Sequence, residues 1–318
     1  MNKTRTRVLT GLQPSGTLHL GNYFGSMRPM LELTHEPDAD VFLMVADYHA
    51  LTSVRDGAAL RRMIMENVRD YLAAGFDPKQ ITLFRQSDNP DHLELAWVFN
   101  CLVSVPFLKQ AHAYKDKVAK GLEPSAGLFT YPMLMAADIV LYDTDVVPVG
   151  EDQRQHVEYA REAVTKFNLT YGPQLKEPRE RIVEGVGVVP GTDGQKMSKS
   201  YQNTIPLFGS TEEIQKAVMR IVTDSEGTHP ENVYAIHQLF KSEAELTPLY
   251  EQNQGKYKVL KDALAADIET FVAPLRERRA AIRDADIRSA LEQGVERARA
   301  VSRDTLRRVR DAVGISLS

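Results

Sequence analysis

The chain has 318 residues, enough for two domains, and its 43% hydrophobic and 26% charged residues are typical of a globular protein in water. The single cysteine, Cys101, excludes an internal disulfide and a zinc site built from several cysteines, and it favours a reducing, cytoplasmic location. No apolar run approaches the roughly 20 residues of a membrane-spanning helix, and no signal-peptide pattern follows the basic start, so we expect no membrane partner.

The first half of the chain alternates between two patterns of apolar residues. Short continuous apolar runs predict strands buried on both faces, and apolar residues three or four positions apart predict helices. The strand patterns cover residues 8–10, 41–46 and 81–84, and the helix patterns cover 20–31 and 60–72. Strands that alternate with helices predict a parallel sheet, whose ligands bind beyond the carboxyl ends of the strands.

The second half contains fewer strand signals. A mostly helical stretch covers residues 93–142, followed by a predicted strand at 145–149 and a predicted helix at 153–167. After residue 207 the pattern is helical, with breaks at prolines. We therefore predict an α/β fold, with a parallel-sheet domain over residues 1–207 and an all-helical domain over residues 208–318.

Although the formal net charge of the chain is −4, one segment near the C-terminus is basic. Residues 274–313 contain eleven arginines and no lysine, against seven acidic residues. One interpretation is a surface that binds RNA. The other is a solvated helix face stabilised by ion pairs between residues four positions apart.

Two segments carry residues suited to a nucleotide. His19-Leu20-Gly21-Asn22 opens the first predicted helix, and helix N-termini bind phosphate through unpaired amides. Gly21 would let an adenine ring lie against the backbone, since it has no Cβ. Far along the chain, Lys196-Met197-Ser198-Lys199-Ser200 follows a glycine-rich stretch and predicts a loop that closes on a polyphosphate. Neither the P-loop nor the dinucleotide fingerprint is present.

A third group lies on the predicted helix that precedes residue 145. Tyr131, Met135, Asp138 and Tyr142 share one helical stripe, in which Asp138 is the only charge. Burying an unpaired carboxylate is costly, so Asp138 needs a partner. That partner is either an arginine or backbone amide of the protein, or the single indole N–H or phenol O–H of an aromatic substrate. Flat apolar walls for such a ring would come from Met135, Val147 and Val149.

Taken together, these segments resemble the class I aminoacyl-tRNA synthetases, and among them the tryptophanyl-tRNA synthetases. The resemblance runs from residue 8 to about residue 313 and rests on five motifs. They are residues 11–16, 135–138, 148–153 with His156, 196–200 and 223–227. It implies a Rossmann-type catalytic domain with a helical dimerisation insertion at about 93–127, a helical domain that meets the tRNA anticodon, and a homodimer.

The resemblance also implies a reaction and its residues. L-tryptophan and ATP would form tryptophanyl-AMP and pyrophosphate, and the tryptophanyl group would pass to tRNA(Trp). Mg²⁺ would arrive with ATP, without a metal cage of the protein. The catalytic group would be His19, Asn22, Lys196 and Lys199. ATP would contact Gln13, Pro14, Ser15, Gly21, Asn22, Gly150, Glu151, Asp152, Val189, Lys196, Met197, Ser198, Lys199 and Ser200. Tryptophan would contact Asp138, Tyr131, Met135, Gln153, Val147, Val149 and His49.

Two positions depart from the family pattern. Asn22 stands where many class I enzymes carry a second histidine, although an amide still donates a hydrogen bond. Leu9 stands where the pocket wall can be aromatic. Two alternatives stay open: a tyrosyl-tRNA synthetase, which has the same fold and signatures, and a synthetase-like binding or regulatory protein without aminoacylation activity.

Overall fold

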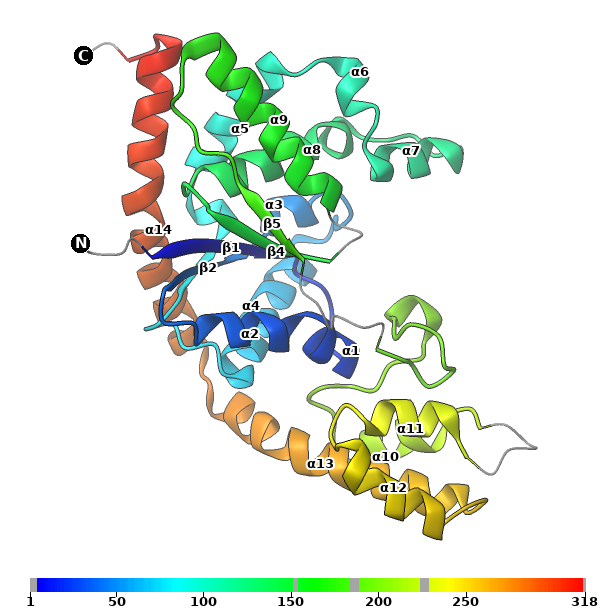
Figure 1. Ribbon diagram of the computed structural model, residues 1–318. Coiled ribbons are helices and arrows are strands. Elements are labelled where there is room, and N and C mark those ends of the chain that lie inside the picture. The colour runs from blue at the N-terminus through cyan, green and yellow to red at the C-terminus, as the bar shows by residue number, and fades with distance from the viewer. Residues whose placement is uncertain (1–4, 151–153, 183–188, 224–228, 317–318) are drawn as a thin grey trace.

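A computed structural model describes residues 5–150, 154–182, 189–223 and 229–316. Its centre is a five-stranded sheet in which all strands run parallel (Figure 1). The strands are β1 (Thr6–Leu12), β2 (Ala39–Val45), β3 (Thr82–Arg85), β4 (Val146–Val149) and β5 (Arg179–Ile182), in the order β3-β2-β1-β4-β5. The direction in which strands are added reverses between β1 and β4, and doubly wound sheets bind ligands at this point.

Helices cover both faces of the sheet, which explains the continuous apolar runs of the strands. One face carries α2 (Arg28–Thr34) and α4 (Gly57–Ala74), and the other carries α5 (Asp91–Leu102), α8 (Ala126–Val140) and α9 (Arg154–Tyr171) (Figure 1). Along β1 the side chains alternate between two apolar cores. Val8 packs into the core that includes α4, and Leu9 packs into the core that includes α8.

The helix predicted at residues 60–72 is observed as the longer α4, whose ends are defined by caps. The Asp56 side chain accepts hydrogen bonds from the backbone N–H groups of Ala58 and Ala59, at 2.8 and 3.0 Å. Gly75 ends the helix with φ +114°, a conformation that favours glycine. Shorter helices complete this part of the chain: α1 (Leu20–Asn22), the π-helical η1 (Tyr23–Met27), α3 (Asp47–Ala50), η2 (Gln86–Asp88), α6 (Val105–Leu108) and α7 (His112–Ala119).

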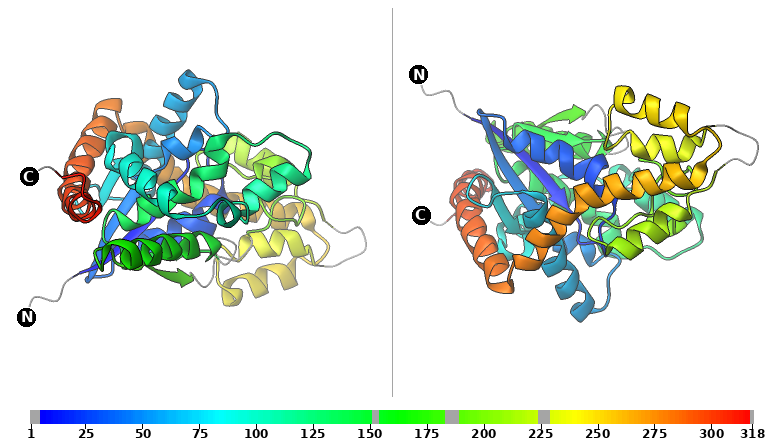
Figure 2. Two further views of the ribbon diagram at one scale, coloured as in Figure 1. Left: turned by 90° about the horizontal axis from the view of Figure 1, so that it is seen from above. Right: turned by 90° about the horizontal axis from the view of Figure 1, so that it is seen from below.

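The chain after residue 207 is helical, as predicted. It contains α10 (Thr211–Met219), α11 (Glu231–His237), α12 (Glu243–Gln252), α13 (Tyr257–Ala281) and α14 (Asp284–Val313), preceded by η4 (Lys199–Tyr201). The long helices α13 and α14 run along one side of the molecule, and α14 returns to the sheet (Figures 1 and 2). The observed fold is therefore the predicted parallel sheet followed by helices.

The last helix shares the core of the sheet. Val295, Ala298, Leu306 and Val309 of α14 lie in the same apolar cluster as α5, α8 and α9. At Gly294 the helix touches β3 so closely that a Cβ atom would lie 1.6 Å from the backbone oxygen of Leu83. This packing fixes α14 against the sheet. The domain boundary near residue 207 stays a prediction.

Most arginines of residues 274–313 bind other parts of the chain. Arg279 Nε lies 2.6 Å from an oxygen of Asp70, Arg308 Nη2 lies 2.7 Å from Asp143, and Arg297 donates to the carbonyls of Pro78 and Ile81. These partners belong to elements far away in sequence. Among the described residues, the ion pairs within this segment, Arg283–Asp286 and Arg307–Asp304, join residues three positions apart and not the predicted four. Arg279, Arg297 and Arg308 instead fasten α13 and α14 to the sheet domain.

Candidate active site

The two predicted nucleotide segments lie side by side at the carboxyl end of β1. Leu20 N–H donates to the carbonyl of Ile205 at 2.9 Å, which joins the start of α1 to the chain just after the lysine loop, residues 196–200. The backbone N–H of Gly21 lies 3.2 Å from the sulfur of Met197, and Lys199 Nζ donates to the carbonyl of Gly16 at 2.8 Å. The segments predicted to bind one nucleotide are therefore in contact.

Gly21 permits this contact because it lacks a side chain. A Cβ atom there would lie 2.9 Å from His19 Nδ1 and 3.1 Å from the Cβ of Met197. The first distance is shorter than packed atoms normally reach and the second is tighter than most contacts, so a larger residue would displace the histidine or the lysine loop. The close approach explains the glycine independently of the predicted adenine contact, which stays a prediction.

His19 is a neutral imidazole at the N-terminus of α1. Its backbone N–H donates to the side-chain oxygen of Asn22 at 3.1 Å, and its side chain is buried. Burial, followed by the positive charge of Lys199, lowers the pKa of His19 from 6.5 to about 4. Its buried Nδ1 atom has no hydrogen-bond partner in the protein. An unpaired polar atom beside a helix N-terminus suits a ligand that supplies the missing partner.

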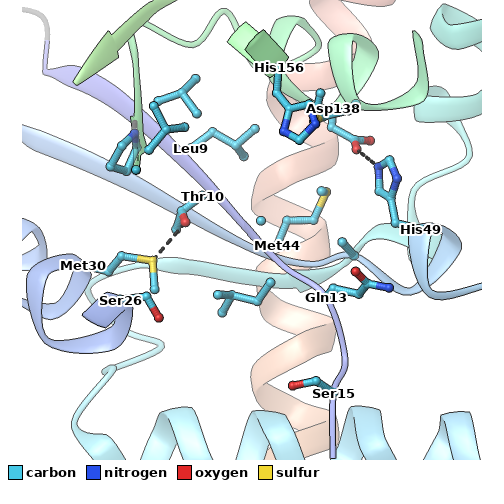
Figure 3. A pocket seen from close by; sticks show the side chains of 18 of the residues that line it. Leu9, Thr10, Gln13, Ser15, Ser26, Met30, Met44, His49, Asp138 and His156 are labelled. Carbon is cyan, nitrogen blue, oxygen red and sulfur yellow. Dashed lines mark hydrogen bonds and ion pairs between the residues drawn. The ribbon is translucent and has the colours of Figure 1, made fainter. Parts of the chain in front are cut away.

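A cavity of about 630 Å³ opens between the carboxyl ends of β1 and β4. Gln13 and Ser15 line it where the chain leaves β1, and His49, Asp138 and His156 lie close together across it (Figure 3). The predicted residues that line the cavity are Gln13, Ser15, Asn22, His49, Tyr131, Met135, Asp138, Val147, Val149 and Gly150. The cavity occupies the place where a doubly wound sheet binds its ligand.

Asp138 is almost fully buried in the wall of this cavity, and three side chains of the described residues donate to it. Its Oδ1 atom lies 2.8 Å from Gln86 Nε2 and 2.7 Å from His92 Nδ1, and its Oδ2 atom lies 2.7 Å from His49 Nε2. Burial favours the uncharged form, but hydrogen bonds from His49 and His92 outweigh it and lower the pKa of Asp138 to about 2. The carboxylate is therefore ionised.

The family model described as tRNA synthetases class I (W and Y) matches residues 1–285. The chain belongs to this synthetase family. It is 41% identical to the tryptophan–tRNA ligase of Fusobacterium nucleatum subsp. nucleatum over 320 residues, covering 97% of this chain and 98% of that relative. It is 42% identical to the tryptophan–tRNA ligase of Rhodopirellula baltica, with 97% and 99% covered.

Solved structures give the same grouping. A tryptophanyl-tRNA synthetase from Campylobacter jejuni, in complex with ADP and tryptophan, matches with a TM-score of 0.91 and 39% identity, covering 97% of this chain and all of that one. A tyrosyl-tRNA synthetase from Archaeoglobus fulgidus matches with a TM-score of 0.63 at 21% identity, covering 87% and 91%. The second likeness shows the shared fold alone, and the full-length relatives favour the tryptophan assignment.

The stripe predicted around Asp138 is only partly correct for this synthetase. Tyr131 and Met135 face the cavity, and the Tyr131 hydroxyl lies 3.3 Å from His156 Nε2. Tyr142 follows the end of α8, is fully buried and does not line the cavity. The partners expected of a structural Asp138, an arginine or a backbone amide, are also wrong, because two histidines and a glutamine take that place.

The remaining predicted residues of the synthetase lie around the lysine loop. Pro14 is buried, and Lys196, Lys199 and Ser200 are exposed. The carbonyl of Val189 accepts a hydrogen bond from Met197 N–H at 2.8 Å, which holds the loop through backbone contact. The backbone N–H of Ser198 donates to the side chain of Asn203, a residue that the sequence motifs did not indicate. The predicted residues Glu151, Asp152 and Gln153 lie outside the described residues.

Asn203 is the residue that shapes this loop. Its Oδ1 atom accepts from Ser198 N–H at 2.7 Å, and its Nδ2 atom donates to the carbonyl of Lys196 at 3.0 Å and to Asp193 at 2.7 Å. A side chain at Gly191 would collide with it at 2.2 Å. In the sequence, only the nearness of Asn203 to Lys199, four residues before it, pointed to this residue. Its contacts become evident only in the folded loop.

The described residues hold no group of three or more histidine, cysteine, aspartate or glutamate side chains that could bind a metal ion. None of the described helices is long and apolar enough to cross a membrane.

Proposed function

We propose that this synthetase activates L-tryptophan with Mg-ATP and transfers it to tRNA(Trp). The observation that carries the proposal is the state of Asp138. Among the described residues, its Oδ1 atom accepts two hydrogen bonds and its Oδ2 atom accepts one, and Asp138 lines the cavity. A carboxylate oxygen accepts about two hydrogen bonds, so Oδ2 has capacity for one further donor. The indole of tryptophan offers one donor and no acceptor.

Apolar contacts support a flat bicyclic ring beside this carboxylate. Met135, Val147 and Val149 line the cavity, together with Leu9 and Met44. A phenol O–H, by contrast, both donates and accepts, and an ionised carboxylate satisfies only its donor. The pocket therefore favours tryptophan over tyrosine through one hydrogen bond and through apolar contact with the larger ring.

In the activation step, a carboxylate oxygen of tryptophan bonds to the α-phosphorus of ATP. The bond from that phosphorus to the oxygen bridging the β-phosphorus breaks, and pyrophosphate leaves with the electron pair. No nucleophile of the enzyme is required, so catalysis rests on positioning and electrostatics. His19 and Asn22 would donate to phosphate oxygens, and Lys196 and Lys199 would neutralise charge on the leaving pyrophosphate, with Mg²⁺ sharing this task.

The transfer step uses the same site. A hydroxyl of the terminal ribose of tRNA attacks the carbonyl carbon of tryptophanyl-AMP, and AMP leaves. The helices after residue 207 would meet the anticodon. A synthetase of this kind acts in the cytoplasm.

The proposal includes a homodimer joined through the segment at about 93–127. Trp97 is 70% exposed, and Leu93 and Val105 are 46% and 55% exposed. Phe99 and Leu108 of the same segment are buried within the subunit, so only part of its apolar content is free for an interface. Large exposed apolar side chains grouped on neighbouring helices are typical of protein interfaces, and a second copy of the chain is the partner that we propose.

Amino-acid-dependent exchange of pyrophosphate into ATP tests the proposal. Tryptophan should support rapid exchange and tyrosine should not. Equal exchange with both amino acids would indicate a site that does not select the indole, and exchange with neither would favour the binding or regulatory alternative.

A further inference from the structure

A chain of buried hydrogen bonds connects Asp138 with the C-terminal helix. His92 Nδ1 lies 2.7 Å from Asp138 Oδ1, and His92 Nε2 lies 2.7 Å from the hydroxyl of Tyr142. Asn89 Nδ2 lies 3.1 Å from that hydroxyl and 3.0 Å from Ser302 Oγ on α14. His92, Asn89, Tyr142 and Ser302 have no exposed surface, so water does not compete for these bonds.

The protons of this chain have only one consistent direction. An ionised Asp138 can only accept, so His92 Nδ1 donates to it. The amide nitrogen of Asn89 can only donate to the Tyr142 oxygen, so the Tyr142 hydroxyl donates its own proton to its other partner, His92 Nε2. The Tyr142 oxygen then accepts from Asn89, and the amide of Asn89 also donates to Ser302.

The far end of the chain is fixed by a second carboxylate. Ser302 Oγ lies 2.6 Å from Asp91 Oδ2, so the serine hydroxyl donates to Asp91 and accepts from Asn89. Each member has a defined donor and acceptor between Asp138 and Asp91. A fully satisfied buried network of this kind holds its side chains in one arrangement.

As a result, the two oxygens of Asp138 have different hydrogen-bond partners. Oδ1 accepts hydrogen bonds from His92 and Gln86. The Gln86 side chain is itself fixed, because its Oε1 atom accepts from the backbone N–H of Tyr48 at 3.1 Å. Rotation of the carboxylate would break both contacts to Oδ1. Oδ2 therefore keeps its direction, and among the described residues it accepts from His49.

We propose that His92 is a positioning residue for amino-acid selection, held by Tyr142, Asn89 and Ser302, and that it directs the free acceptor position of Asp138 at the substrate's ring N–H. The inference rests on the proposed function. It assigns a part in tryptophan recognition to residues that do not touch the cavity, and it extends that part to Ser302 on the C-terminal helix.

The test is the Tyr142→Phe variant in pyrophosphate exchange. This substitution removes the hydroxyl that fixes His92 and keeps the ring in the core. Each protein is assayed with tryptophan and with the benzothiophene isostere, which lacks the ring N–H. We expect the KM for tryptophan to rise about five-fold, the effect of one neutral hydrogen bond, with the KM for ATP unchanged. The preference for tryptophan over the isostere should fall by a similar factor.

Tyr250→Phe is the matched control. Tyr250 is also buried, and its hydroxyl lies 3.1 Å from the buried His237, but both residues lie in the helical part after residue 207. This variant should keep the wild-type preference for tryptophan. His92→Asn keeps an N–H donor near the position of Nδ1 and should retain part of the preference, whereas His92→Leu should lose it. Ser302→Ala, at the far end of the chain, should have the smallest effect.

The outcomes separate this inference from the function on which it rests. If the wild-type protein shows no tryptophan-dependent exchange, the proposed function fails. If the wild-type protein responds to tryptophan while Tyr142→Phe retains the same preference as Tyr250→Phe, the function stands and the positioning role of His92 is wrong. A fall in kcat with an unchanged preference would also overturn it, because a general loss of packing does not discriminate between the two substrates.

Discussion

Lys199 and Gly16 are joined by a hydrogen bond of 2.8 Å across 183 positions of sequence. The ammonium group of Lys199 therefore lies beside the turn that follows β1, close to the predicted phosphate-binding residues. Although the residue as a whole is exposed, partial desolvation of its ammonium group lowers the pKa of Lys199, and the nearby Asp70 opposes this effect. The fold thus places the positive charge of Lys199 next to the segment after β1 that is predicted to bind the nucleotide.

A first prediction concerns this cation. Lys199→Ala should lower kcat for adenylate formation by about 10²-fold or more, the effect of removing one preorganised electrostatic contact in a transition state. The KM for ATP should change little. Steady-state pyrophosphate exchange measures both constants. Lys258→Ala, which removes an 85% exposed lysine from α13, is the control and should match the wild type. An Lys199→Ala enzyme with normal kcat and a raised KM for ATP would instead indicate ground-state binding.

A second prediction concerns Asp138. Asp138→Asn keeps one acceptor oxygen but removes the charge, so tryptophan binding should weaken by about 1–2 kcal/mol, the difference between charged and neutral hydrogen bonds. Asp138→Ala should cost more, because the indole N–H would be buried unpaired. ATP binding should be nearly unaltered. Titration of both ligands by calorimetry provides the comparison.

The isostere without the ring N–H is the control for Asp138. The wild-type protein should discriminate strongly against it, and Asp138→Ala should barely distinguish it from tryptophan. Equal discrimination by both proteins would make Asp138 a carboxylate that serves only its histidine and glutamine partners.

A third prediction follows from the environment of His19. With a pKa of about 4, the folded protein keeps this ring neutral at pH 7, while the unfolded chain protonates it near pH 6.5. Between these values the unfolded state binds the additional proton, so the contribution of His19 to folding stability is present above pH 6.5 and is lost as the pH falls towards 4. An NMR titration of the histidine rings should show His19 titrating well below pH 6, and a value near 6.5 would contradict the buried, neutral ring.

A fourth prediction concerns the contact between α14 and β3. Gly294→Ala should destabilise the protein by at least about 1–3 kcal/mol, because its Cβ would overlap the backbone of Leu83. Alanine is intrinsically better than glycine inside a helix by about 1 kcal/mol, so a lowered Tm would have to come from packing. Gly57→Ala at the start of α4 meets no atom within 4 Å and should keep or raise the Tm. Thermal unfolding of both variants should show opposite signs, and equal Tm values would show that the helix shifts freely.

A fifth prediction concerns assembly. Trp97→Asp should weaken the proposed dimer, because a 70% exposed indole would be replaced by a charge that must be desolvated in an interface. Sedimentation at micromolar concentration should show a dimer for the wild type and a smaller species for the variant. A wild-type monomer of 35.7 kDa with full activity would exclude the dimer as the functional unit.

Sequence patterns predicted the elements whose apolar residues follow a regular spacing. The apolar run at 41–46 became β2, and the helix pattern at 60–72 became α4. The strand β5 was missed because its residues are Arg179, Glu180, Arg181 and Ile182, which lack the apolar pattern of a buried strand. This strand lies at the edge of the sheet, where polar residues are tolerated.

The site was predictable where its residues sit on local motifs. His19, Gly21 and Lys199 belong to short segments with a recognisable composition, and the fold brings them together. Asn203, Gln86 and His92 were not predicted, because each acts through a side-chain contact with a residue that is distant or on another turn. The return of α14 to β3 depends on a glycine inside a helix, and the helix pattern alone does not identify the surface that it touches.

Aminoacylation of tRNA(Trp) tests the central claim most directly. Purified protein, Mg-ATP and tRNA(Trp) are incubated with labelled tryptophan or labelled tyrosine, and acid-precipitable label is measured. The account predicts tryptophanyl-tRNA(Trp) and no tyrosyl product. Adenylate formation without transfer to tRNA, or charging with tyrosine at a rate equal to that with tryptophan, would contradict it.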